Sequence, residues 1–177
     1  MSTLRLNHAV LYVRDAERTA QFYEQVLGFS RGDYTDTIPG ARFLRAPGST
    51  NDHDIGLFEV GETAGPSAAG RGGSVGLWHL AWEVETLAQL QRFAVQLEAA
   101  GALSRAVDHG SIKSLYGRDP DGLRFEIAWL VPASLLDPGD LSARALLQPL
   151  DLAAEIRRYG ADACGGTRVP RHLPVAE

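Results

Sequence analysis

The sequence predicts an α+β fold built from two copies of one strand–helix–three-strand (βαβββ) module. Three observations support this prediction. Two β-rich segments each carry a histidine at the same place, a helical pattern that ends at a glycine follows each segment, and a proline precedes each module's last strand. The matched positions are His8 and His79, Gly28 and Gly101, and Pro47 and Pro120.

The first module is predicted over about residues 4–66. Alternation in residues 4–13 predicts a strand that puts five residues on one face: Leu4, Leu6, His8, Val10 and Tyr12. Apolar residues then recur at helical spacing until Gly28 ends the helix. Residues 54–60 predict the last strand of the module.

The second module is predicted over about residues 74–132, with a strand at 77–84, a helix at 87–100 and a last strand at 123–131. One such module cannot cover both faces of its sheet. We therefore expect the two to pair in one open, eight-stranded, barrel-like sheet around a cleft. The alternative is two unrelated α+β layers that share an order of elements by chance.

The modules together form a predicted domain over residues 1–136, and residues 137–177 form a C-terminal extension. Residues 137–140 interrupt the pattern, and residues 141–159 predict an amphipathic helix. Its apolar stripe is Leu146, Leu147, Leu150 and Ile156, which is typical of packing on the parent domain or on a dimer mate. The tail after Gly160 is punctuated by Gly and Pro, and we expect it to be flexible.

Composition excludes several classes of protein. The 17 basic and 22 acidic residues give a formal charge of -5, which argues against a nucleic-acid partner. The single cysteine rules out an intramolecular disulfide and fits a reducing compartment. No apolar run is long enough to span a membrane, and the start of the chain lacks a secretory signal. We therefore expect a cytoplasmic protein without a membrane or nucleic-acid partner.

Three residues have the chemistry of a metal site. His8 and His79 lie at equivalent places in the two modules, and Glu126 lies within an apolar strand, where an unpaired carboxylate is costly. Two imidazoles and one carboxylate can bind a divalent metal ion and leave other coordination positions open. Taken singly, each histidine is more typical of a hydrogen-bonded strand residue and the glutamate of a solvent-facing one. Their joint occurrence favours the metal site.

The chain resembles the vicinal-oxygen-chelate superfamily, whose members pair two βαβββ modules around a metal cleft. The resemblance extends from about Leu4 to Pro132 and implies that His8, His79 and Glu126 are the metal ligands. Three motifs carry it: Leu6-Asn7-His8-Ala9-Val10, Tyr23-Glu24-Gln25-Val26-Leu27-Gly28-Phe29, and Asp119-Pro120-Asp121-Gly122 followed by Glu126.

A narrower resemblance is to the extradiol ring-cleaving dioxygenases of this superfamily. Their signature is matched by Val107-Asp108-His109, then Leu115-Tyr116, then Asp119-Pro120-Asp121-Gly122 and finally Glu126. His53 is placed like the histidine that those enzymes use for proton transfer. Taken singly, His109 is typical of a loop residue that caps backbone groups, Tyr116 of a core aromatic and His53 of a solvated turn residue.

The resemblance implies an Fe(II)-dependent dioxygenase, with Mn(II) as the other suitable metal, that cleaves a catechol-type diol with O2. His53 is expected to transfer protons, Tyr116 to hydrogen-bond a substrate oxygen, and His109 to hydrogen-bond the oxygen bound to the metal. The product would be a semialdehyde acid, as in aromatic degradation. Aromatic walls of the pocket are expected from Trp78, Phe43 or Trp129, and a homodimer or higher homo-oligomer is the expected assembly.

Three other functions are open to this superfamily. A metal-dependent thiol transferase of the antibiotic-resistance kind would need a basic pocket, for which the loops offer Arg45, Lys113 and Arg118. A non-catalytic module that binds small molecules would typically lack a full ligand set. An isomerase or epimerase would have a fourth, carboxylate ligand at the position of Gly56, where glycine supplies no oxygen.

Overall fold

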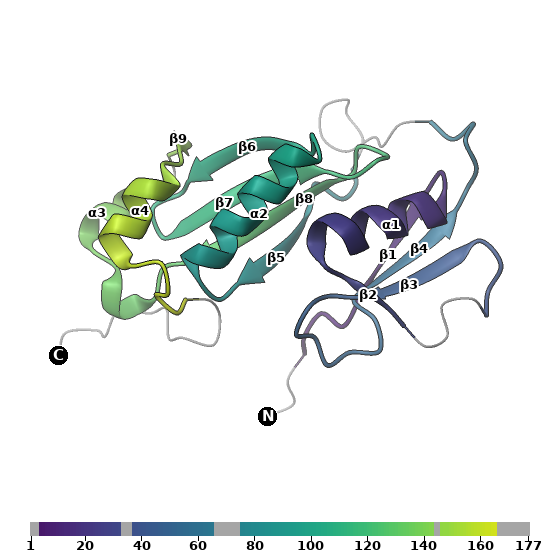
Figure 1. The fold of residues 1–177 in the computed structure, drawn as a ribbon, viewed down its shortest axis with the longest axis horizontal. Helices are drawn as coiled ribbons and strands as arrows, with labels where there is room; N and C mark the ends of the chain where they lie inside the picture. The colour runs from purple at the N-terminus through teal and green to yellow at the C-terminus, as the bar shows by residue number, and fades with distance from the viewer. Residues whose placement is uncertain (1–3, 33–36, 66–74, 144–145, 166–177) are drawn as a thin grey trace. The chain divides into compact units, whose positions relative to one another are not determined.

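The computed structural model describes residues 4–32, 37–65, 75–143 and 146–165. The chain divides into two compact units, shown in Figure 1. Unit 1 comprises Met1–Ser74 with Asp119–Leu123, and unit 2 comprises Val75–Arg118 with Arg124–Glu177. Each unit runs strand, helix and three strands along the chain, which confirms the predicted α+β class and the βαβββ repeat.

Unit 1 is an open four-stranded sheet in the order β1-β4-β3-β2, with helix α1 on one face. Strand β1 runs parallel to β4, and the other pairs are antiparallel. The bounds are β1 Ala9–Val13, α1 Ala16–Leu27, β2 Ser30–Arg31, β3 Ala41–Arg45 and β4 Ile55–Glu59.

Helix α1 has a clear start and stop signal. The Asp15 side chain accepts a hydrogen bond of 2.8 Å from the Arg18 amide, and Gly28 ends the helix in the left-handed region at φ 73°. The helix buries Ala20, Tyr23 and Leu27, and the side chains of β3 and β4 buried on the same face of the sheet are Leu44, Ile55 and Leu57. The opposite, open face therefore carries Val10, Phe43 and Gly56, which lie level with one another in the sheet.

Unit 2 repeats this plan with a five-stranded sheet in the order β5-β8-β7-β6-β9. Its helix, α2, begins with a capping box of Thr86 and Gln89. Along β5 the exposure alternates: Trp82 and Val84 are the more covered residues, whereas Ala81 and Glu83 are exposed. The bounds are β5 Leu80–Val84, α2 Leu87–Ala99, β6 Leu103–Asp108, β7 Ile112–Arg118 and β8 Arg124–Leu130.

In the described residues the strands thus form two separate open sheets rather than one eight-stranded sheet. The ninth strand, β9 (Gln148–Pro149), comes from the C-terminal extension and pairs with β6. No helix in the described ranges has the length and apolar composition that crossing a membrane requires.

The prediction of one helix over residues 141–159 is wrong. A 3-10 turn, η1 (Ala133–Leu135), is followed by two short helices, α3 (Pro138–Ser142) and α4 (Leu152–Tyr159), with β9 between them. Pro149 cannot donate a helical hydrogen bond, and Asp151 caps a new helix by accepting a bond of 2.9 Å from the Ala154 amide. Leu146 and Leu147 of the expected stripe are exposed.

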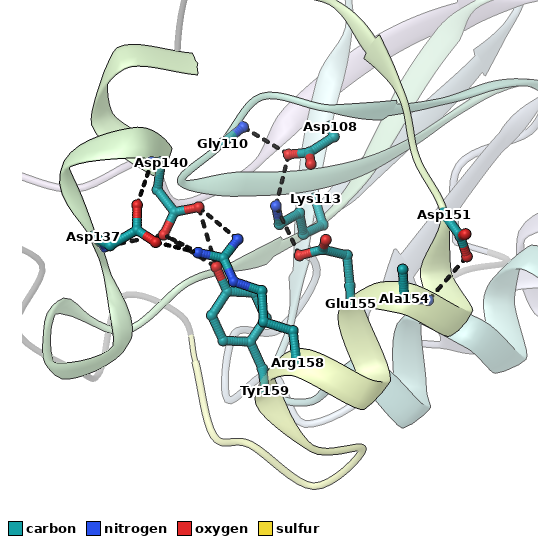
Figure 2. A network of polar contacts seen from close by, with 10 residues as sticks. All are labelled: Asp108, Gly110, Lys113, Asp137, Asp140, Asp151, Ala154, Glu155, Arg158 and Tyr159. Atoms are coloured by element: carbon teal, nitrogen blue, oxygen red, sulfur yellow. Dashed lines mark hydrogen bonds and ion pairs between the residues drawn. The ribbon is translucent and has the colours of Figure 1, made fainter.

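Helix α4 is joined to unit 2 by the polar network shown in Figure 2. Lys113 of β7 is fully buried, and its Nζ lies 2.7 Å from Asp108 Oδ1 and 2.9 Å from Glu155 Oε2 of α4. At the other end of the network, Arg158 pairs with Asp137 and Asp140 across 2.6 and 2.9 Å. The extension is therefore part of the packed structure of unit 2.

The tail after Gly160 was expected to be flexible. Its first residues are hydrogen-bonded to unit 2: Trp129 Nε1 donates to the Ala163 carbonyl at 3.2 Å, and the Gly165 amide donates to the Glu85 carbonyl at 2.8 Å. Residues 166–177, to which the expectation also applied, lie outside the described residues.

Candidate functional site

Unit 1 brings together two of the predicted site residues, His8 and His53. Their ring centroids are 4.5 Å apart, and the Phe43 ring meets His53 edge-on at 5.1 Å. The Nδ1 atom of His8 lies 2.7 Å from Asn7 Oδ1. Burial lowers the pKa of His53, the nearby His8 lowers this pKa further, and the charges of Asp52 and Asp54 act in the opposite direction.

The loop that carries His53 is fixed by Asp54. This carboxylate accepts hydrogen bonds of 2.8 to 2.9 Å from the Ala46 amide, Ser49 Oγ and Asn51 Nδ2. Asn51 Nδ2 also donates to the Asn7 carbonyl at 2.9 Å. The same loop is thereby tied to the residue that precedes His8, which explains why the two imidazoles meet.

The strand registers give Gly56 and Glu126 the same place in the two units. Gly56 pairs with Val10, two residues after His8, and Glu126 pairs with Ala81, two residues after His79. A Cβ atom at Gly56 would lie 3.3 Å from the Phe43 ring. At the place where unit 2 has a carboxylate, unit 1 therefore has a glycine that lies beside the Phe43 ring.

Unit 2 brings together the other four predicted residues. On its open face, opposite α2, His79 Nε2 lies 3.0 Å from Glu126 Oε2, and Ser114 Oγ donates a hydrogen bond of 2.5 Å to Glu126 Oε1. Tyr116 is level with Glu126 in the sheet, and its hydroxyl lies 3.0 Å from His109 Nε2. Burial raises the pKa of Tyr116, and the charge of Glu126 raises this pKa further.

The His79–Glu126 pair fits a divalent metal ion. Their separation of 3.0 Å is that of an ordinary ion pair, and it is also close to the distance between two ligand atoms that lie about 2.1 Å from one ion and at right angles to each other. The Nδ1 atom of His79 is buried and has no hydrogen-bond partner in the described part of the chain. No group of three or more His, Cys, Asp or Glu side chains able to hold a metal ion occurs in the described ranges. The predicted triad takes His8 from unit 1 and the other two ligands from unit 2, so it stays a prediction.

The Asp119-Pro120-Asp121-Gly122 motif forms a turn within unit 1. Asp119 Oδ1 accepts hydrogen bonds of 2.9 Å from the Asp121 and Leu123 amides, whereas the buried Oδ2 has no partner among the described residues. Burial raises the pKa of Asp119 to about 6, although these amides oppose the change. Asp121 pairs with Arg14 at 3.2 Å and with Arg18 at 3.0 Å. The motif therefore shapes and anchors a turn.

Of the three aromatic residues that were expected to line the pocket, Trp129 was predicted wrongly. Phe43 contacts His53, and Trp78 is half exposed beside His79. Trp129 is fully buried on the face of the sheet that α2 covers, where its ring lies 5.4 Å from that of Tyr159. It belongs to the core of unit 2.

The basic residues near the site also differ from expectation. Lys113 is buried on the helix side and ion-paired, so it is not available to a pocket. Two arginines that the sequence analysis missed lie against aromatic rings of unit 2: Arg105 over Tyr116 and Arg124 over Trp78. Side chains two residues apart on a strand lie on the same face, so Arg124 shares the face of Glu126 and Ser114 shares the face of Tyr116. This two-residue spacing is the sequence signal that could have indicated Arg124 and Ser114.

Comparisons with known proteins agree with the fold. The family model described as "Glyoxalase/Bleomycin resistance protein/Dioxygenase superfamily" matches residues 5–127. Biphenyl-2,3-diol 1,2-dioxygenase 3 of Rhodococcus globerulus is 35% identical over 126 residues, which are 71% of this chain and 63% of that protein. The chain thus matches less than two thirds of that relative's length.

Two solved structures illustrate the likeness. A glyoxylase/bleomycin resistance protein/dioxygenase domain from Frankia sp. EAN1pec is 25% identical with a TM-score of 0.55, over 72% of this chain and 92% of that one. The fosfomycin resistance protein FosX of Listeria monocytogenes is 19% identical with a TM-score of 0.52, over 72% and 90% of the two chains. The FosX match shows a shared fold alone.

Proposed function

Since the chain belongs to the glyoxalase/bleomycin resistance protein/dioxygenase superfamily, we propose that it is a non-haem Fe(II)-dependent extradiol dioxygenase. Its substrates would be a catechol-type aromatic diol and O2. The observation that carries the proposal is the gathering of His79, Glu126, Tyr116 and His109 on the face of the unit 2 sheet opposite α2. The relative from Rhodococcus globerulus, itself named as a diol dioxygenase, also supports it.

The proposed metal ligands are His8, His79 and Glu126. Fe(II), or Mn(II) in its place, would bind both diol oxygens and make O2 reactive toward the ring. Ser114 holds Oε1 of Glu126, so that Oε2 faces His79. This division of the two carboxylate oxygens is what a ligand with a fixed orientation requires.

The other residues would act on the substrate. His53, beside His8, would take a proton from a diol hydroxyl and later return one. The Tyr116 hydroxyl, held by His109 Nε2, would hydrogen-bond a substrate oxygen. Burial of Tyr116 and the charge of Glu126 both raise the pKa of this hydroxyl.

The three rival functions have less support. Antibiotic-resistance proteins are present among the structural matches as FosX fosfomycin resistance proteins, whose identities of 20% and 19% indicate a shared fold alone. An isomerase with a fourth, carboxylate ligand is disfavoured because Gly56, which has the place of Glu126 in unit 1, supplies no side-chain oxygen. A non-catalytic binding module would typically lack a full ligand set, whereas this chain has the three candidate ligands His8, His79 and Glu126.

Oxygen uptake tests the proposal. The protein, reconstituted with Fe(II) without air, is mixed with catechol, 3,4-dihydroxybenzoate or biphenyl-2,3-diol in aerated buffer. We expect equimolar loss of O2 and diol, with formation of the ring-opened acid, for at least one of these diols. The metal-free protein and the Glu126→Gln variant serve as controls. Absence of O2 uptake with all three diols in the iron-loaded protein refutes the proposed function.

A further inference from the structure

Two arginines lie beside the unit 2 site on strands that flank Tyr116. Arg105 of β6 is level with Tyr116 in the sheet, and its Cζ lies 4.7 Å from the centre of the Tyr116 ring. Arg124 of β8 precedes Glu126 by two residues, and its Cζ lies 4.3 Å from the centre of the Trp78 ring. The two guanidinium groups therefore lie next to the residues of the proposed site.

Neither arginine has a carboxylate partner among the described residues. Five other arginines of the chain do form ion pairs with Asp or Glu side chains: Arg14, Arg18, Arg31, Arg42 and Arg158. Arg105 and Arg124 stack on aromatic rings instead. Stacking fixes the plane of a guanidinium and leaves its N–H edge free to bind a carboxylate through two hydrogen bonds.

The strand registers give the positions of these two arginines relative to Glu126. Arg105 is level with Tyr116, which is itself level with Glu126, so the three side chains form one row across the sheet. Arg124 is displaced from Glu126 by one pleat repeat, which is about 7 Å. That displacement is comparable to the distance from the hydroxyls of a catechol to a substituent on the opposite side of its ring.

We infer that Arg105 and Arg124 form an anion-binding end of the substrate site, and that the substrate is an aromatic vicinal diol with a carboxylate substituent. This inference rests on the proposed function and narrows its substrate class. It also separates the chain from its relative in Rhodococcus globerulus, because the diol named for that protein, biphenyl-2,3-diol, carries a neutral phenyl group.

Substrate preference tests the inference in the iron-loaded enzyme. We expect kcat/KM for 3,4-dihydroxybenzoate to exceed that for catechol by at least about tenfold. The Arg105→Gln and Arg124→Gln variants should each raise KM for 3,4-dihydroxybenzoate by about 10- to 100-fold, as expected for a lost charge-assisted hydrogen bond. The same variants should change KM for catechol by less than about threefold, and Arg105→Lys should recover part of the loss. The matched control is Arg92→Gln, at an exposed position of α2.

Binding measurements separate a failure of this inference from a failure of the proposed function. Calorimetry on the Mn(II)-loaded protein compares the affinities of 3,4-dihydroxybenzoate, catechol and phenylphosphonate without any turnover. Tighter binding of 3,4-dihydroxybenzoate that is lost in Arg105→Gln supports the inference, even if no diol is cleaved. Equal affinity for catechol, or a preference that survives both Gln variants, overturns it. Phenylphosphonate that binds as tightly as the anionic diol overturns the diol as the ligand class.

Discussion

Replacing Ser114 with alanine tests how the proposed metal ligand is held. The Ser114 hydroxyl is fully buried and donates a bond of 2.5 Å to Glu126 Oε1. A buried hydrogen bond to a charged group contributes about 1.5–3 kcal/mol. If this contribution fixes Glu126 in its ligating orientation, its loss corresponds to an increase of about 10- to 150-fold in the metal dissociation constant.

The assay is equilibrium dialysis of Mn(II) against the wild type and Ser114→Ala, with urea unfolding of both proteins to verify that the fold is retained. Ser104→Ala is the matched control, because Ser104 lies exposed on β6. We expect this control to change Mn(II) affinity by less than about twofold. An Mn(II) dissociation constant in Ser114→Ala within twofold of the wild-type value would refute the role of Ser114 in orienting Glu126.

Four further predictions concern the site and the stability of the two units. Glu126→Gln should nearly abolish Fe(II) occupancy measured by metal analysis after dialysis, and full loading would exclude Glu126 as a ligand. His53→Phe should retain the metal but lower the rate of O2 uptake by about 10²- to 10⁴-fold, since it removes the proton-transfer group; an unchanged rate would remove His53 from the mechanism. Lys113→Met should lower the free energy of unfolding in urea by about 3–5 kcal/mol, because it leaves two carboxylates without their buried partner. A decrease in the free energy of unfolding below about 1 kcal/mol would contradict this expectation, since it would show that water replaces the ammonium as a partner of the two carboxylates. Asp119→Asn tests the pH dependence of stability. Burial raises the folded pKa of Asp119 from 3.8 to about 6, so its stabilising contribution is complete below pH 3.8 and is lost as the pH rises through 6. Between about pH 4 and 7 the free energy of unfolding of the wild type, measured in urea, should fall by up to about 3 kcal/mol relative to that of Asp119→Asn. The same dependence of this free energy on pH in both proteins would contradict the prediction.

The fold could be predicted because its local signals agree with one another. Gly28 terminates α1 as predicted, whereas His8 and His79, which were predicted within strands over residues 4–13 and 77–84, lie just before β1 and β5. The extension could not be predicted in the same way, because residues 141–159 contain apolar residues at helical spacing. The competing signals, Pro149 and the cap at Asp151, decide the structure there.

The site was predictable only in part. His109 and Tyr116 came from a motif of fixed spacing, and the structure places them in contact. Ser114, Arg105 and Arg124 belong to no such motif, and their relevance depends on which strands neighbour β7 and in what register. Lys113 was misplaced because it lies one residue from Ser114 and therefore points to the opposite face.

The burial of Lys113 has a consequence for how this chain could be shortened or could evolve. The family match ends at residue 127, yet Glu155, which neutralises the ammonium of Lys113, lies beyond it on α4. A fragment cut at residue 136 would remove α4 and with it one of the two carboxylates that pair with the Lys113 ammonium. We therefore expect a chain of this family that lacks α4 to carry an uncharged residue at position 113.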